Sequence, residues 1–122
     1  MPKTNKPRLP TTEQFLAYYP QRQPYEWTLD EEQRVCIQVP KFQHSIGKKF
    51  CKIIKKENKF TARLDEIGSI IWQHTDGKKT VKDILQILQK QFTDQDNIDQ
   101  RLYLFLQQMH HLNYITLYQS TS

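Results

Sequence analysis

The sequence predicts a single domain of the α+β class, and three observations lead to this prediction. The chain has 122 residues, which is enough for one domain with a short appendage. Short runs in its first half alternate apolar and polar residues as strands do, whereas apolar residues in its second half recur every three or four positions as in helices. Hydrophobic residues make up 37% of the chain, enough for one compact core.

The beginning of the chain predicts an N-terminal arm. Five of the six prolines lie there, and proline resists regular structure because it fixes its own φ and has no amide hydrogen to donate. A brief helix within the arm would place Phe15, Leu16 and Tyr19 against the domain. We therefore expect a Pro-rich arm at residues 1–24 and a domain at residues 25–122.

Three strands are expected at the start of this domain. Residues 25–29 and 34–39 alternate with period two, and Pro40 ends the second run. The polar residues between these runs suit a hairpin loop. Residues 59–64 alternate in the same way and predict a third strand with its apolar positions facing inward.

A basic insert separates the last two of these strands. Residues 41–59 contain seven lysines and a single acidic residue, so they carry more than the whole net charge of +5. Apolar residues from Phe42 to Ile54 recur at steps of three to four and predict a helix over residues 41–56 with the lysines on its opposite face. Such a surface attracts nucleic acid, acidic peptides or anionic lipid, or it keeps the protein soluble.

The helices that follow have clear starting signals. Asp65 is a suitable N-cap for a helix over residues 67–75. Thr80 and Asp83 have the spacing of a capping box and predict a second helix over residues 80–92.

A third helix is expected over residues 98–112, followed by a closing strand at residues 114–118. Its apolar residues extend beyond one face and include Leu104. Either two elements pack against this helix, or one of its faces lines a groove that awaits a partner.

Several of these segments resemble the PqqD family. Residues 64–72 (LDEIGSIIW) and 76–84 (DGKKTVKDI) follow two sequence patterns of its members. Residues 101–109 (RLYLFLQQM) follow a third, the family's Arg-x-x-x-Phe-Leu-x-x-Leu helix, with Met109 where leucine is usual. The order of the elements agrees too, so the resemblance extends over about residues 34–118.

The resemblance implies a winged-helix-like fold of about three β-strands plus three C-terminal α-helices, here with an N-terminal extension and the basic helical insert. It also implies a non-catalytic accessory protein, a recognition element for ribosomally made and later modified peptides. Such domains capture the leader of a precursor peptide and present it to a maturation enzyme, often a radical-SAM protein. The leader is added as an extra strand beside the third strand, against the third helix.

On this resemblance, peptide-binding residues are expected on those two elements, and the nearby lysines favour an acidic leader. From the strand we expect Lys59, Phe60, Thr61, Ala62, Arg63 and Leu64, and from the helix Arg101, Tyr103, Leu104, Gln107, Gln108 and His111.

The residues indicate neither a catalytic centre nor a cofactor. Three glycines cannot form a Gly-rich phosphate loop, and two cysteines without a Cys-x-x-Cys motif exclude a four-thiolate zinc site. His110 and His111 diverge by roughly 100° on a helix, so no metal is expected there. No apolar run approaches the roughly 20 residues that cross a bilayer, and we expect a cytoplasmic protein with no membrane partner.

The alternative function is nucleic-acid binding. The first two helices and the turn between them have the lengths of a helix-turn-helix, and Lys78, Lys79 and Lys82 cluster where phosphate contacts would be natural. Arginine, on which base readout depends heavily, is scarce, and the third helix carries Arg101 as its one basic residue besides histidine. A further possibility is a subunit that contacts its partner through the Pro-rich arm.

Overall fold

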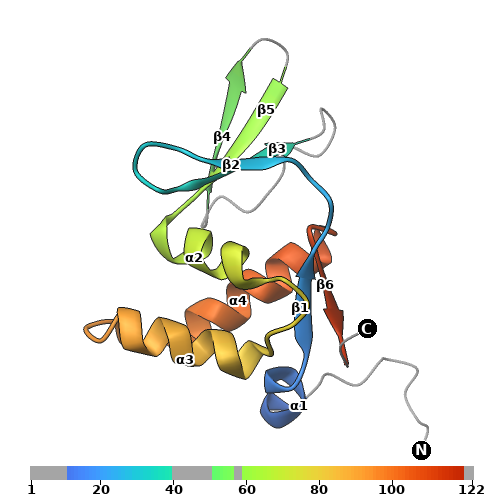
Figure 1. Ribbon diagram of the computed structural model, residues 1–122, viewed down its shortest axis with the longest axis vertical. Coiled ribbons are helices and arrows are strands. Elements are labelled where there is room, and N and C mark those ends of the chain that lie inside the picture. The colour runs from blue at the N-terminus through green and yellow to red at the C-terminus, as the bar shows by residue number, and fades with distance from the viewer. Residues whose placement is uncertain (1–10, 40–50, 57–58, 120–122) are drawn as a thin grey trace, which may run out of the picture.

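The computed structural model describes residues 11–39, 51–56 and 59–119, with side chains described for residues 11–38 and 61–119. It confirms the α+β class: a sheet lies at one end of the molecule and a group of helices at the other (Figure 1). In chain order the elements are α1 Thr12–Leu16, β1 Tyr19–Arg22, β2 Trp27–Leu29, β3 Val35–Val39, β4 Cys51–Lys56, β5 Lys59–Leu64, α2 Glu66–His74, α3 Val81–Gln91, α4 Ile98–His111 and β6 Ile115–Tyr118.

Four strands form one antiparallel sheet in the order β2-β3-β5-β4. The centre of the sheet is β5, where Ala62 pairs with Ile37 of β3 on one side and with Ile53 of β4 on the other. Val35, Ile37, Ala62 and Leu64 are fully buried, so β3 and β5 supply the sheet's contribution to the core.

The helix expected over residues 41–56 was wrong where the structure describes it, because residues 51–56 form β4. Two adjacent isoleucines favour a strand, and β4 pairs with every residue of β5 from Leu64 back to Lys59. Helical spacing of apolar residues carries no information about such a neighbouring strand. Residues 41–50 of the expected helix lie outside the described residues.

A two-stranded antiparallel ribbon joins the two ends of the described chain, with β1 paired to β6. The arm expected at residues 1–24 therefore contains two regular elements, α1 and β1. Pro20 is tolerated in β1 because its carbonyl points away from β6 and accepts a hydrogen bond from Gly77 N at 2.9 Å. At such a position the missing amide hydrogen costs no bond between β1 and β6.

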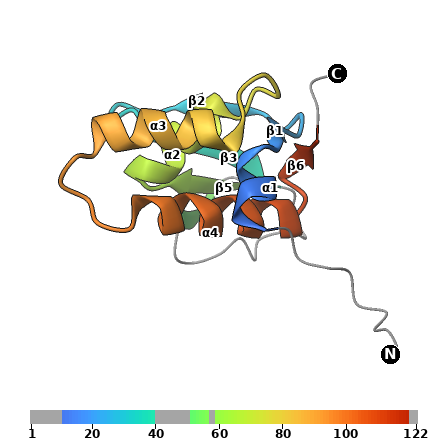
Figure 2. The ribbon, with the colours of Figure 1, turned by 90° about the horizontal axis from the view of Figure 1, so that it is seen from below.

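The three C-terminal helices appear as expected, and α2 lies between α3 and α4 (Figure 2). The Asp65 side chain accepts from Gly68 N at 2.7 Å, and Thr80 forms the expected capping box with Asp83. α2 and α4 approach so closely at Gly68 that a Cβ there would lie 2.9 Å from the Phe105 ring. The contact ties the end of β5 to the helix that borders β6.

Candidate functional site

A leader that adds as a strand beside Lys59–Leu64 requires a free edge on β5. This expectation was wrong, because both edges of β5 are occupied. β3 pairs with β5 from Phe60 to Arg63, and β4 pairs with it along its whole length. From Phe60 to Arg63, both sides of the β5 backbone therefore face a neighbouring strand, and a peptide added there would have to displace one of the two neighbours. The strand that closes the edge comes from the lysine-rich insert.

The residues expected on α4 divide between different faces of the helix. Arg101 forms an ion pair with Asp65, the N-cap of α2, and thus joins two helices. The Tyr103 ring meets the Phe15 ring edge to face, with the centroids 5.4 Å apart. Leu104 keeps 53% of its surface exposed, and Gln108 is half-buried.

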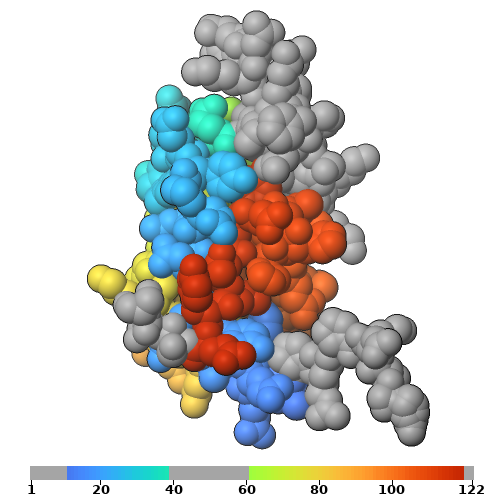
Figure 3. Space-filling model, turned by 90° about the vertical axis from the view of Figure 1, so that its right-hand side faces the viewer, coloured from blue at the N-terminus to red at the C-terminus, as the bar shows by residue number. Residues whose placement is uncertain are grey.

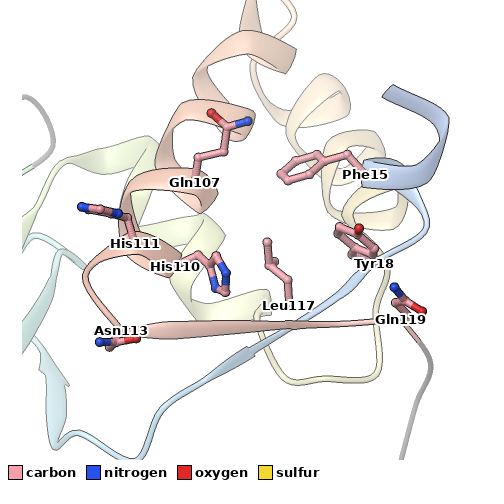
Figure 4. Close-up of a pocket in the computed structure, with 8 residues that line it drawn as sticks. All are labelled: Phe15, Tyr18, Gln107, His110, His111, Asn113, Leu117 and Gln119. Atoms are coloured by element: carbon pink, nitrogen blue, oxygen red, sulfur yellow. The ribbon is translucent and has the colours of Figure 1, made fainter. Parts of the chain in front are cut away.

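The remaining two residues expected on α4, Gln107 and His111, line a groove of about 740 Å³ (Figure 4). This groove lies between α4, α1 and β6, and we call it the β6 groove. Phe15, Tyr18 and Leu117 give it an apolar wall, and the rest of its lining consists of Gln107, His110, His111, Asn113 and Gln119. None of these lining residues carries a carboxylate.

The wall formed by α1 is fixed by local hydrogen bonds and by ring contacts. Thr11 and Gln14 form a capping box that closes the first turn of α1. Phe15 is buried and contacts Tyr18 and Tyr103 edge to face. The Tyr18 carbonyl accepts a hydrogen bond from Val81 N at 2.9 Å, which holds this wall to the first residue of α3.

The opposite wall depends on how the chain turns from α4 into β6. Asn113 has a positive φ of 66°, a left-handed conformation that ends helices, and Tyr114 N donates to the Met109 carbonyl at 2.8 Å. β6 therefore starts directly beside the last turn of α4. There His110 Nδ1 lies 3.2 Å from the Ile115 carbonyl oxygen.

Hydrogen bonds on the far side of β1 show which backbone groups of β6 point away from β1. Arg22 N donates to Thr75 O and Pro20 O accepts from Gly77 N, so both residues direct their backbone groups away from β6. In an antiparallel pair, opposite residues either both face each other or both face away. Their partners Ile115 and Leu117 therefore direct their N–H and carbonyl groups away from β1.

Among the described residues, this outward edge of β6 has no bonded partner at Leu117. At Ile115 the carbonyl is covered by His110, but no described group is bonded to the outward N–H and carbonyl of Leu117. Figure 3 shows β6 at the surface, between the N-terminal segment on one side and α4 on the other. Leu104 and Tyr118, which keep 53% and 46% of their surfaces exposed, belong to the same two elements, α4 and β6.

The titratable groups near these elements do not form a catalytic arrangement within the described residues. Burial, assisted by Asp99, raises the pKa of Tyr103, which keeps its hydroxyl protonated beside the groove. Burial also raises the pKa of the free Cys36 thiol and disfavours its reactive thiolate. No cluster of three His, Cys, Asp or Glu side chains suited to a metal occurs in the described part of the chain.

The lysines considered for nucleic-acid binding are partly neutralised. Lys79 Nζ lies 2.9 Å from Asp76 Oδ2, while Lys78 and Lys82 are exposed. Burial opposes ionisation of Asp76, but hydrogen bonds from Lys79 and from the backbone outweigh it and lower the pKa of Asp76 to about 2. No helix in the described residues is long and apolar enough to span a membrane.

Sequence reasoning missed most of the lining of the β6 groove: Phe15, Tyr18, His110, Asn113, Leu117 and Gln119. Phe15 was expected to contact the domain, but its partner on β6 lies about a hundred positions away along the chain. The one available signal was Asn113, a residue suited to a left-handed turn between a helix and a strand.

Comparison with known proteins supports the resemblance noted in the sequence. The family model described as "Coenzyme PQQ synthesis protein D (PqqD)" matches residues 54–115. A protein of Acinetobacter baylyi named "PqqA binding protein" is 42% identical over 55 residues, which cover 45% of this chain and 56% of that protein. The chain thus matches a little over half the length of this relative. No solved structure matches it significantly.

Proposed function

The chain belongs to the PqqD family, and from this premise we propose that it is a non-catalytic accessory protein that captures the leader of a ribosomally made precursor peptide. The relative named for binding PqqA supports a peptide as the ligand.

We place the captured leader at the β6 groove. The observation that carries this proposal is the edge of β6 at Leu117, whose N–H and carbonyl point away from β1 and whose residue lines a groove with an apolar wall. An extended peptide gains affinity from backbone hydrogen bonds to such an edge, and selectivity from the pockets beside it. The β6 groove offers both within one site.

The outer edges of the four-stranded sheet belong to β2 and β4, and the β4 edge is less suitable than β6. Three of the six residues of β4 are lysines, and lysine on an edge strand opposes the addition of another strand. The β6 edge carries no charged side chain at all, since its residues are Ile115, Thr116, Leu117 and Tyr118.

The twelve residues expected from the resemblance take different parts in this proposal. Gln107 and His111 contact the leader in the β6 groove, and the exposed Leu104, one turn before Gln107, extends the contact along α4. Arg101 and Tyr103 support the groove through Asp65 and Phe15. The other expected residues, which are Gln108 and the six residues of β5, belong to the scaffold that carries α4.

We further propose that the captured leader is presented to a maturation enzyme such as a radical-SAM protein. The lysines of residues 41–59, which carry more than the whole net charge of +5, attract an acidic leader and speed its association. Since only a short stretch of leader pairs with β6, the rest of the precursor stays available to that enzyme.

A calorimetric titration with the precursor peptide encoded beside this chain's gene tests the proposal. We expect one equivalent to bind with a Kd of about micromolar or tighter, and more weakly as salt is raised. The variant Gln107→Trp fills the groove from an exposed position and should reduce the affinity at least about tenfold.

Gln100→Trp is the matched control, because Gln100 is an exposed glutamine on the same helix outside the groove lining. It should bind the peptide like the unmodified protein. Equal losses in the two variants would contradict the placement in the groove. No heat with the unmodified protein, together with sub-micromolar binding of random duplex DNA, would favour the nucleic-acid alternative instead.

A further inference from the structure

We infer that the β6 groove selects extended segments in which a large apolar residue is followed two positions later by a carboxylate. The inference rests on the proposed function and adds the chemistry of the peptide that the groove recognises. It depends on three features: the open backbone groups of Leu117, the apolar wall around that residue, and the different chemistry of the two ends of the groove.

The apolar residue is specified by Leu117. A strand that bonds to the outward N–H and carbonyl of Leu117 places its own opposing side chain on the same face of the ribbon. That face is the apolar part of the groove, because Leu117 lines it with Phe15 and Tyr18 (Figure 4). A leucine, methionine or phenylalanine at this position would lose its exposure to water against three apolar side chains.

The direction of the bound segment follows from the strand pairing of the protein. Every strand pair in the described residues is antiparallel, and antiparallel pairing is slightly more stable per residue than parallel pairing. An antiparallel segment runs from the Gln119 end of the groove towards Ile115. The residue two positions after the apolar one therefore reaches the Ile115 end, where His110 covers the outward carbonyl of β6 and backbone pairing stops, and its side chain lies on the groove face.

The Ile115 end of the groove suits a carboxylate. His110, His111 and Asn113 come from the last turn of α4 and the residues after it, so hydrogen-bond donors and both histidines gather at this end (Figure 4). None of the described lining residues is an aspartate or a glutamate that would repel a carboxylate.

The carbonyl groups at the end of α4 would otherwise disfavour an anion there. Three of them already accept backbone hydrogen bonds, namely those of Gln108, Met109 and His110. The opposite end of the groove presents the neutral amide of Gln119. The order of the two ligand residues should therefore matter, with the apolar residue first and the acid second.

Short fluorescein-labelled peptides of identical composition test this inference by fluorescence anisotropy on the full chain. They are built from threonine, valine and serine, with one leucine and one aspartate. In the first peptide the aspartate follows the leucine by two positions, in the second it precedes it by two, and in the third the two residues are adjacent. We expect the first to bind at least about tenfold more tightly than the others, because only its carboxylate reaches the donors.

A second measurement assigns the carboxylate to the histidine end. Replacing the aspartate of the first peptide by asparagine should weaken binding to the unmodified protein and should have little effect on the variant His111→Leu. The variant Gln100→Leu, on the exposed part of α4 outside the groove, should discriminate like the unmodified protein.

Equal affinities for the three peptides, or unchanged discrimination in His111→Leu, would overturn the inference. If the precursor peptide still bound in a way that Gln107→Trp blocks, the proposed function would stand without it. If the precursor also failed to bind, both would be wrong.

Discussion

Strands β5 and β6 differ in what lies beside their backbones. β5 has β3 on one side and β4 on the other, so all its strand positions are filled. β6 has β1 on one side only, and its other side faces a groove between two helices. The two strands have similarly apolar inward positions, so composition does not make one open and the other closed. The neighbouring elements determine whether each strand has an open edge. For β5 this neighbour is β4, the strand supplied by the insert.

Removing β4 should open the edge of β5 and make it comparable to the edge of β6. Replacing residues 41–58 by Asn-Gly leaves Pro40 and Lys59 flanking a two-residue turn, which suits a direct hairpin because Val39 already pairs with Phe60. The edge of β5 would then be exposed. We expect calorimetric titration with the precursor peptide to saturate at two equivalents, compared with one for the full chain.

The control for this variant is a cooperative thermal transition, which shows that the shortened protein folds. Adding Gln107→Trp to it should return the stoichiometry to one, because only the β6 groove is blocked. A folded variant that still binds one equivalent would show that β4 does not cover a peptide site.

The starts of the helices were predicted correctly because their signals are local. Asp65 caps α2, and Thr80 with Asp83 caps α3, within three residues of sequence. The prediction that β5 has a free edge was wrong for the opposite reason. The strand that pairs with this edge is formed by residues 51–56, and the spacing of their apolar residues also fits a helix. The β6 groove could not be predicted, since its lining combines Phe15 and Leu117, which lie about a hundred positions apart in the sequence.

The two strands share a support, the close approach of α2 and α4 at Gly68. Replacing Gly68 by alanine would place a Cβ 2.9 Å from the Phe105 ring and equally close to Asp65 Oδ1. We expect the free energy of unfolding to fall by about 1–3 kcal/mol, measured by urea denaturation. Ser69→Ala is the comparison variant at the next position. It would lower the free energy of unfolding through the loss of the hydrogen bond from Val35 N to the serine hydroxyl at 2.8 Å, not through a steric clash. An unchanged stability in Gly68→Ala would contradict the close contact.

A proline at position 117 tests whether the open edge of β6 donates a backbone hydrogen bond to the peptide. The N–H of Leu117 points away from β1, so Leu117→Pro removes a donor of the groove without removing a bond between β1 and β6. We expect the precursor peptide to bind up to about tenfold more weakly, the effect of one hydrogen bond. Leu117→Ala keeps the N–H and removes most of the side chain, so it measures separately what the side chain contributes to the affinity for the peptide. If the alanine variant lost as much affinity as the proline variant, the backbone of β6 would not pair with the peptide.

The smallest expected effect concerns the far edge of β1, which the turn at Asp76 covers through the bond from Gly77 N to Pro20 O. The pKa of Asp76 is lowered from 3.8 to about 2, so its ionised form stabilises the folded protein above pH 4. That contribution should be lost as the pH falls from about 4 to about 2, and partial exposure to solvent keeps it below about 1 kcal/mol. Urea denaturation of the protein and of Asp76→Asn across this range measures it, because the variant lacks the titrating group. Parallel pH profiles for the two proteins would show that the ionised Asp76 carboxylate does not stabilise the turn that covers this edge.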